Sequence, residues 1–176
     1  LTLDFLRAGQ PAEKFIRELT PAAGDYAGFN LLCGDSDGLY YFSNAGGGYR
    51  ELQAGIFGLS NAHLDTPWPK VRLAKQRLET LLAQTEIDPQ TAMSILHDPH
   101  TAADEALPDT GISLEWERQL SAQFIRIDGY GTRCTSVLLQ ENSGRTVFFE
   151  QEFNQQGPGG QRLKVFSPKA CPDLQK

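Results

Sequence analysis

Cysteine is scarce in this chain of 176 residues, which holds only Cys33, Cys134 and Cys171, far apart in the sequence. No CxxC pair occurs among them, so the pattern predicts neither a disulfide framework nor a zinc site. We therefore expect all of these thiols to be free. Such cysteine usage is typical of a reducing compartment, and we expect a cytoplasmic protein.

Long hydrophobic runs are also missing. No apolar stretch approaches the roughly 18 to 20 residues that a bilayer-spanning helix needs, so we expect no membrane span. Basic residues are few, because 16 Lys and Arg stand against 22 Asp and Glu, a formal net charge of −6. Nucleic-acid binders concentrate positive charge, and this balance argues against a DNA or RNA partner.

Methionine is nearly absent, since the chain begins at Leu1 and its single methionine is Met93. We therefore expect that an N-terminal segment of the fold precedes Leu1, and that any organelle-targeting signal would lie in it. The length and the 40% hydrophobic content suffice for one core. We expect residues 1–176 to form a single domain, with a mobile tail at 167–176.

Hydrophobic periodicity predicts an α+β fold. Residues 2–8 are apolar but undecided between helix and strand, and the Phe15, Ile16 and Leu19 stripe predicts a helix that ends at Thr20. Further helices are predicted at 69–83, 88–96 and 113–120, with Asp88 and Ser113 as caps. Strands are predicted at 29–33, 39–42, 56–59, 130–139, 145–153 and 163–166, with a turn at 154–160. This order favours antiparallel sheets with segregated helices over alternating βαβ units.

The segment 58–71, GLSNAHLDTPWPKV, combines a strand end with a proline-bracketed loop and a helix start. Free N–H groups at the helix start, beside two cations, would form a site for a carboxylate or phosphate. The candidate ligand-binding residues here are Asn61, His63, Asp65, Trp68, Lys70 and Arg72. The alternative is that the asparagine and aspartate cap turns, the tryptophan fills the core and the cations form a solvated face. His63 is a candidate haem-iron ligand or proton donor, or else a solvent-facing loop histidine.

The segment 130–139, YGTRCTSVLL, places Arg133 beside small hydroxyl residues at a strand entrance. Arginine is suited to holding a carboxylate or lowering the pKa of a nearby thiol, and the alternative is a surface ion pair. Cys134 is a candidate nucleophile, although a strand cysteine is more often a small buried hydrophobe. His97 and His100 flank a proline that prevents their alignment on one helix, so no metal site is predicted.

Acidic residues cluster in the middle of the chain. Between Leu78 and Glu117 there are nine acidic residues and no Lys or Arg, whereas four basic residues lie between Lys70 and Arg77. We expect a polarised surface. This asymmetry favours, as one alternative, a protein-interaction domain without a small ligand.

Several blocks of the sequence resemble, in order, those of the NRDE family, the homologues of Transport and Golgi Organisation protein two. The blocks are GFNLL at 28–32, LYYFSN at 39–44, residues 58–71, LP at 107–108 with TG at 110–111, and residues 130–139. The resemblance implies an αββα sandwich of the N-terminal-nucleophile hydrolase type. It also implies intracellular handling of haem, or of acyl-coenzyme A and related lipids. The family's Met-Cys start and Asn-Arg-Asp-Glu motif do not occur here.

The same two motifs are similar to blocks of choloylglycine hydrolases, which implies Asn61 as an oxyanion-hole donor and Arg133 as a cation beside an N-terminal Cys nucleophile. We expect the main role to be binding and passing on haem or a similar amphipathic anion, with no cofactor required and haem only as cargo. The alternative is an N-terminal-nucleophile hydrolase of non-peptide or linear amide C–N bonds, with its nucleophile in the segment expected before Leu1.

Overall fold

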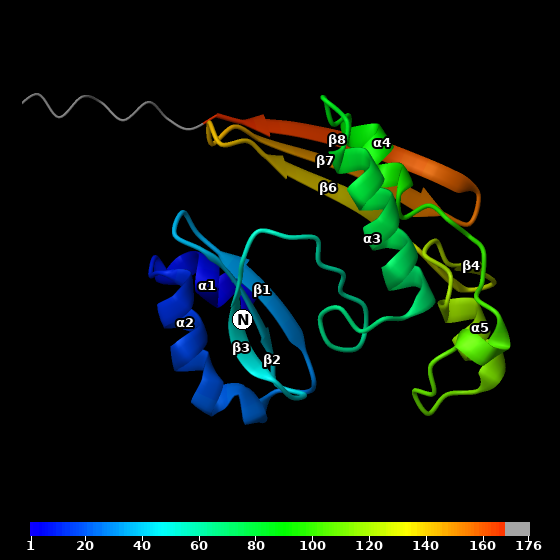
Figure 1. Ribbon diagram of the computed structural model, residues 1–176, viewed down its shortest axis with the longest axis horizontal. Coiled ribbons are helices and arrows are strands. Elements are labelled where there is room, and N and C mark those ends of the chain that lie inside the picture. The colour runs from blue at the N-terminus through cyan, green and yellow to red at the C-terminus, as the bar shows by residue number, and fades with distance from the viewer. Residues whose placement is uncertain (168–176) are drawn as a thin grey trace, which may run out of the picture. The chain divides into compact units, whose positions relative to one another are not determined.

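The structure is a computed structural model, and it describes residues 1–167. The chain divides into two compact units, Leu1–Thr66 and a second unit that begins at Pro67 (Figure 1). Each unit joins helices to an antiparallel sheet. Apart from its first residue, the tail predicted at 167–176 lies outside the described residues, and the single-domain assignment stays a prediction.

The first unit places helices on one face of a three-stranded sheet with the order β1-β2-β3. Its elements are α1 (Thr2–Ala8), α2 (Ala12–Leu19), the 3-10 helix η1 (Thr20–Asp25), β1 (Asn30–Gly34), β2 (Leu39–Ser43) and β3 (Gly48–Leu52). Phe15, Ile16 and Leu19 of α2 pack in one core with Leu31 of β1 and Phe42 of β2. The predicted stripe is therefore confirmed, and burial of each such side chain contributes about 2 kcal/mol.

Two assignments in the first unit are now settled. The undecided segment at 2–8 is a helix, which ends at Gly9 with a left-handed backbone (φ 58°). The strand predicted at 56–59 is wrong, and the third strand is Gly48–Leu52, whose Tyr49 pairs with Phe42. The pattern missed this strand because it holds only two large apolar side chains. Residues 56–59 instead belong to a loop held by its own hydrogen bonds.

The second unit contains the remaining elements. These are α3 (Pro69–Leu82), α4 (Pro89–Ser94), η2 (Asp104–Ala106), α5 (Leu114–Leu120), β4 (Arg126–Ile127), β5 (Tyr130–Gly131), β6 (Cys134–Gln140), β7 (Thr146–Asn154) and β8 (Gly157–Phe166). Both predicted caps are confirmed, because Asp88 accepts from the Thr91 N–H at 2.8 Å and Ser113 accepts from the Trp116 N–H at 3.4 Å.

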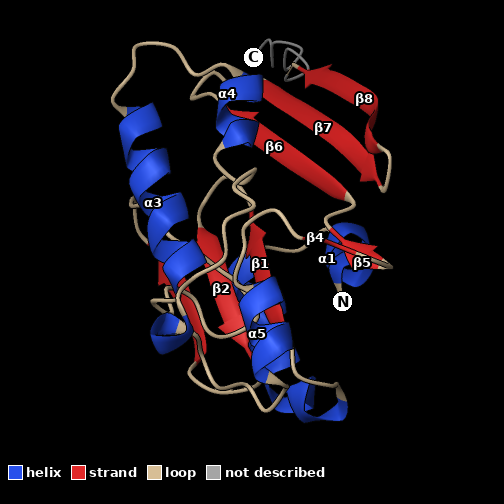
Figure 2. Ribbon diagram, turned by 90° about the vertical axis from the view of Figure 1, so that its right-hand side faces the viewer, coloured by secondary structure: helices blue, strands red, loops and turns tan. Residues whose placement is uncertain are grey.

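The larger sheet of this unit has the order β6-β7-β8, and α4 lies against β6 (Figure 2). Alternate residues of β7, among them Val147 and Phe149, are buried. Their partners Leu139 and Val137 share a face of β6 with Thr135, which contacts His97 just after α4. This face is therefore the one that α4 covers. Side chains alternate between the two faces of a strand, so the buried residues of β7 all point to the same face.

The strand predicted at 130–139 is wrong as a single element, because it breaks at Thr132 and Arg133. The Thr132 N–H donates to the Ile125 carbonyl at 2.8 Å, whereas the Arg133 carbonyl accepts from the Phe153 N–H at 2.7 Å. The chain thus changes partner between two residues, leaving β4 and joining β7. The last strand is longer than predicted, since β8 begins at Gly157 and not at residue 163.

All strand pairs that the structure describes are antiparallel, so the α+β class with antiparallel sheets is confirmed. Within residues 1–167, no helix is long and apolar enough to cross a membrane. Cys33 and Cys134 are free thiols, and the Cys171 prediction lies outside the described residues. Burial raises the pKa of the Cys33 thiol, with Asp35 adding to the effect.

Candidate functional site

The loop at 58–66 in the first unit is closed on itself by backbone and side-chain hydrogen bonds. The Gly58 N–H donates to Asp65 Oδ1 at 2.8 Å, and the Asp65 N–H returns to the Gly58 carbonyl at 2.7 Å. Asp65 has a left-handed backbone (φ 62°), which is uncommon for a residue with a side chain. The hydrogen bond from the Gly58 N–H to the Asp65 carboxylate therefore offsets the backbone strain at Asp65.

The same loop is attached to the sheet by two strand residues. The Asn30 side-chain amide donates to the Ala62 carbonyl at 2.9 Å, and the Tyr41 hydroxyl donates to Asn30 Oδ1 at 2.6 Å. The Leu64 N–H donates in turn to the Tyr41 hydroxyl at 3.2 Å. Fastened at both strands, the loop is a fixed platform and not a free connection.

Asn61 and His63 lie on this platform with exposed side chains. The His63 ring lies beside the β2–β3 turn, where a Cβ added to Gly46 would stand 3.6 Å from His63 Cε1. The Asn61 amide makes no side-chain hydrogen bond within the described residues. Both groups are thus available to a ligand, as an amide donor and an imidazole. Asp65, in contrast, is a loop-closing residue.

Lys70, at the start of α3 in the second unit, already has an internal partner. Its ammonium donates to the Leu120 carbonyl at 2.8 Å and lies 5.6 Å from the centre of the Trp68 ring. The Gln123 side chain donates to the Lys70 carbonyl at 2.9 Å. Burial lowers the pKa of the lysine, with Glu117 opposing this effect. Lys70 therefore ties α3 to the end of α5.

The N-terminus of α3 offers few free N–H groups. Pro69 has none, and the N–H groups of Val71 and Arg72 donate to the Trp68 carbonyl at 2.9 and 3.0 Å. Trp68 is half-buried, and the Arg72 side chain is exposed. Of the features predicted for an anion site here, the structure leaves the Arg72 guanidinium and little else.

Arg133 lies in a cavity of about 420 Å³ in the second unit. This size falls in the range of small-molecule sites, roughly 300 to 1,000 Å³. The wall contains apolar and aromatic side chains together with two cations: Phe124, Ile125, Ile127, Phe153, Pro158, Tyr130, Arg126 and Arg133. No Asp or Glu is among the described residues that line it. The cavity thus combines an apolar body with positive charge.

The β4–β5 hairpin and its neighbours explain why this cavity forms. A Cβ on Gly131 would lie 2.7 Å from the Ile125 carbonyl oxygen, so only glycine permits the close approach of these two backbones. Thr132 fixes the approach, because its hydroxyl oxygen accepts from the Ile125 N–H at 3.0 Å. The Tyr-Gly-Thr-Arg sequence therefore fixes the backbone that carries Tyr130 and Arg133 to the cavity.

Neither cation of the cavity is firmly bound by protein groups. Arg126 reaches the Gln155 carbonyl at 3.3 Å, a long hydrogen bond. The exposed Arg133 side chain makes no hydrogen bond or ion pair among residues 1–167. A guanidinium carries five N–H donors in a planar fork that matches a carboxylate. Both groups can therefore turn toward an anionic ligand.

Aromatic rings form the back of this cavity. Phe124 and Phe153 meet edge to face with their centres 4.8 Å apart, and the His97 ring lies behind them at 5.4 and 5.2 Å. His97 Nε2 lies 3.2 Å from the Thr135 hydroxyl. Burial lowers the pKa of His97, so the neutral imidazole is favoured. The His97 ring thus supports Phe124 and Phe153 from behind and does not itself line this cavity.

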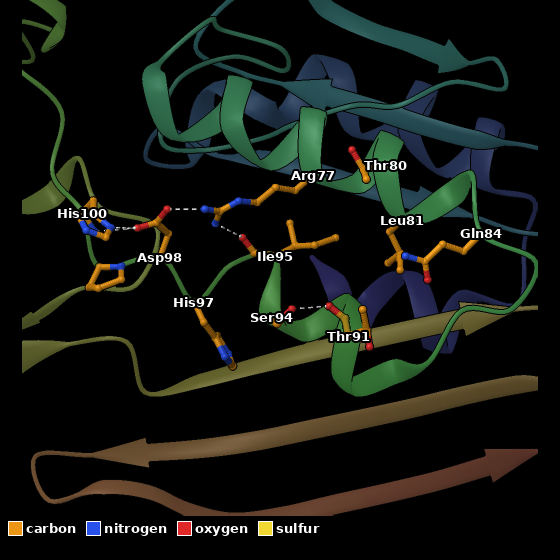
Figure 3. Close-up of a pocket in the computed structure, with 11 residues that line it drawn as sticks. Arg77, Thr80, Leu81, Gln84, Thr91, Ser94, Ile95, His97, Asp98 and His100 are labelled. Carbon is orange, nitrogen blue, oxygen red and sulfur yellow. Dashed lines mark hydrogen bonds and ion pairs between the residues drawn. The ribbon is translucent and has the colours of Figure 1, made fainter.

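A second cavity, of about 550 Å³, lies beside α3 and α4 (Figure 3). Asp98 accepts from Arg77 Nη2 at 2.5 Å and from the His100 N–H at 2.9 Å, and lies 2.6 Å from His100 Nδ1. The two His100 contacts, followed by Arg77, hold the pKa of Asp98 at about 2. His97 points away from this group, so the two histidines do not converge.

The acidic stretch carries fewer free charges than its composition suggests. Arg118 binds Asp104 at 2.8 Å and Glu115 at 2.6 Å. Glu117 is buried and accepts from the Thr110 N–H at 2.7 Å and from its hydroxyl at 2.5 Å. Together with Asp98, these groups have partners inside the second unit. The expected one-sided acidic surface is thereby reduced.

The predicted site residues are therefore distributed over both units. Asn61, His63 and Asp65 belong to the first, whereas Trp68, Lys70, Arg72 and Arg133 belong to the second. Sequence reasoning found Arg133 but missed Arg126, Phe124 and Phe153. These residues follow no motif, and their convergence depends on strand pairing between distant segments. In the sequence, only the glycine of the Tyr-Gly-Thr-Arg motif could have indicated the close approach of two backbones beside this cavity.

The fold and the cavity define an α+β protein with antiparallel sheets and a cavity of basic and apolar character. The model of the family described as Transport and Golgi organisation 2 matches residues 1–155. The chain belongs to this family, which confirms the NRDE resemblance.

Three relatives carry the same description. The chain is 30% identical over 167 residues to the Transport and Golgi organization protein 2 homolog of Bos taurus, covering 86% of this chain and 60% of that protein. The Mus musculus and Homo sapiens homologues are 27% and 28% identical, again over 86% of this chain and 60% of theirs. The chain thus spans about 60% of the length of these curated relatives.

Proposed function

We propose that this chain binds an amphipathic anion, of the kind that haem and acyl-coenzyme A represent, in the cavity around Arg133. One observation carries the proposal: an apolar cavity of about 420 Å³ holds two guanidinium groups and no described carboxylate. A ligand with an apolar body and an acidic group satisfies both features at once. In the proposed role the chain passes this ligand on within the cytoplasm.

The start of α3 is the weaker candidate for the same role. Its most favourable cation, Lys70, already donates to the Leu120 carbonyl. Moving that ammonium to a ligand would leave the carbonyl without its donor, at a cost of about 1 to 3 kcal/mol. The Arg133 side chain has no hydrogen bond to a described residue that it would have to break. The geometry therefore favours Arg133 as the primary anion-holding residue, and iron ligation by His63 stays a prediction.

Charge reversal in the cavity tests the proposal. The 176-residue chain is titrated calorimetrically with dodecanoate, an amphipathic anion without a ring, at low and at moderate salt. Because two attractive charges become repulsive, the variant Arg126→Glu with Arg133→Glu should bind at least about tenfold more weakly, and more so at low salt. Arg72→Glu is the comparison variant, since it removes the exposed cation at the start of α3 and should change affinity by less than about twofold.

Two results would overturn this assignment. If the double variant binds dodecanoate as tightly as the unmodified chain at low salt, the Arg133 cavity is not the site. If Arg72→Glu is the variant that loses affinity, the ligand lies at the start of α3, as the sequence alone predicted.

A second candidate is an N-terminal-nucleophile amide hydrolase, favoured by the Asn61 amide on its fixed platform. The two functions diverge at Asn61→Ala. In a protein that carries the N-terminal Cys nucleophile this function requires, loss of an oxyanion donor should lower the turnover of a linear N-acyl amide by about 100- to 1,000-fold. A binding protein has no turnover to lose, and the substitution would leave dodecanoate affinity unchanged.

A further inference from the structure

Two exposed aromatic side chains adjoin the Arg133 cavity. Tyr130, which lines the cavity, is 53% exposed, and Trp116 of α5 is 46% exposed. Their ring centres are 6.0 Å apart with an interplanar angle of 82°, an edge-to-face contact. Trp116 thus extends the aromatic surface beyond the cavity. We call this pair the aromatic ledge.

The position of the ledge is fixed by backbone contacts on both sides. Tyr130 pairs with Ile127 across the β4–β5 hairpin, and the next residue, Gly131, lies against the Ile125 carbonyl. Trp116 lies in the first turn of α5, where its N–H donates to the Ser113 cap. The backbone on both sides is therefore fixed before any ligand arrives, and the two rings contact each other edge to face. Such preorganisation lowers the ordering cost of binding.

Exposure of both rings is costly for the free chain, since aromatic side chains bury large apolar areas in most proteins. The neighbouring Ile112 and Leu114 are also exposed, at 45% and 53%. Three of residues 112–116 are thus exposed apolar side chains, and Trp116 connects them to the cavity through its contact with Tyr130. The same cavity holds Arg126 and Arg133. This combination fits an anionic ligand whose ring system stacks on an aromatic face.

We infer that the aromatic ledge is a stacking subsite, and that it selects amphipathic anions that carry a flat aromatic ring system over those that carry only an alkyl chain. The inference rests on the proposed function, because it concerns the same cavity. In this arrangement Arg126 and Arg133 hold the acidic group. The ring system lies against Tyr130, and Trp116 supports that ring from its edge.

A pair of matched probes tests the subsite. 1-Pyrenebutyrate and dodecanoate both carry one carboxylate and an apolar body, but only the first has a flat ring system. The full 176-residue chain and its Trp116→Ala and Tyr130→Ala variants are titrated with each probe. Stacking on an aromatic side chain contributes enough that each variant should bind 1-pyrenebutyrate about tenfold more weakly. In Trp116→Ala, whose ring lies outside the cavity, affinity for dodecanoate should change by less than about twofold. In Tyr130→Ala, which removes part of the cavity wall, affinity for dodecanoate should fall by less than affinity for 1-pyrenebutyrate does.

Fluorescence gives an independent measure of probe occupancy, because Trp68 and Trp116 are the two tryptophans of the chain. In Trp68→Phe the remaining emission comes from Trp116. 1-Pyrenebutyrate should quench it in proportion to occupancy, whereas dodecanoate should not. Circular dichroism of each variant checks that the fold is kept, and Trp116→Phe, which retains an aromatic ring, should recover most of the lost affinity.

The outcomes separate this inference from the function beneath it. If neither probe binds the unmodified chain, the proposed function fails and the inference falls with it. If both probes bind but Trp116→Ala and Tyr130→Ala weaken them equally, or weaken neither, the cavity is real and the ledge is not a stacking subsite. Selective loss of 1-pyrenebutyrate binding supports the subsite.

Discussion

The start of α3 and the segment that joins β5 to β6 each carry a cation that the sequence marks as functional, yet the two cations differ in surroundings. Lys70 is half-buried and donates to the Leu120 carbonyl, and burial lowers its pKa. Arg133 is exposed, and its side chain has no partner among the described residues. The first cation holds two helices together, whereas the second is available to a ligand.

The difference shows that a charge in a motif is informative only when its partners are known. Arg77 follows the pattern of Lys70, because it binds Asp98, the Ile95 carbonyl and Gln123. Lys70 and Arg77 therefore bind other segments of the second unit. Part of the basic helix face predicted from composition is thus neutralised or hydrogen-bonded within that unit. Arg72 is exposed like Arg133 and lies in the first turn of α3.

The largest expected effect comes from Lys70→Glu, when Lys70, Arg72 and Arg133 are each changed to glutamate in separate variants. Lys70→Glu removes the donor of the Leu120 carbonyl and brings a carboxylate near the buried Glu117. It should lower the free energy of unfolding by about 2 to 3 kcal/mol. Arg72→Glu and Arg133→Glu are exposed and should change it by less than about 0.5 kcal/mol. Urea unfolding at neutral pH measures all of these variants, and equal effects would remove the distinction between tied and available cations.

An intermediate effect is expected at Asp98, the partner of Arg77. Its pKa is held at about 2, below the ordinary 3.8, chiefly by the contacts to His100. A carboxylate with a lowered pKa stabilises the fold fully above the ordinary value, and this stability is lost as the pH falls toward 2. Asp98→Asn should therefore cost about 1 to 2 kcal/mol at neutral pH.

The difference between Asp98→Asn and the unmodified chain should shrink as the pH falls from about 4 to 2, because both side chains are then neutral. Asp128→Asn is the matched control. It lies in the Asp-Gly turn between β4 and β5, where asparagine is equally suited, so it should leave stability nearly unchanged. If the difference in unfolding free energy between Asp98→Asn and the unmodified chain did not change with pH, the ion pair between Asp98 and Arg77 would not be its source.

The smallest effect is expected at His97, behind the open cavity. Burial lowers its pKa, so acidification forces a proton onto a ring packed against Phe124 and Phe153. The sign is therefore a loss of stability as the pH falls below the ordinary value of 6.5. His97→Gln can keep a hydrogen bond to Thr135 without titrating, so its unfolding free energy should fall less between pH 7.5 and 5. Parallel curves for the two proteins would show that the ring does not titrate in this way.

Much of the local structure follows from the sequence alone. The α2 stripe, the Asp88 and Ser113 caps and the start of α3 at Pro69 rest on interactions within a few residues, and the structure confirms them. The family blocks likewise identified the family. The free thiols Cys33 and Cys134 followed from cysteine usage, because no spacing among them suggested a bridge.

Tertiary structure decided what no local pattern could. The strand predicted at 56–59 became a loop because Asp65 closes it onto Gly58, and Gly48–Leu52 became a strand because β2 offers it a partner. The cavity likewise depends on Phe124 meeting Phe153, 29 positions away in the sequence. Whether a cation is tied or available is also a long-range property, since Lys70 finds its acceptor at Leu120. Hydrogen-bond partners and apolar contacts are set by packing between distant segments, whereas propensities and caps act over a single turn.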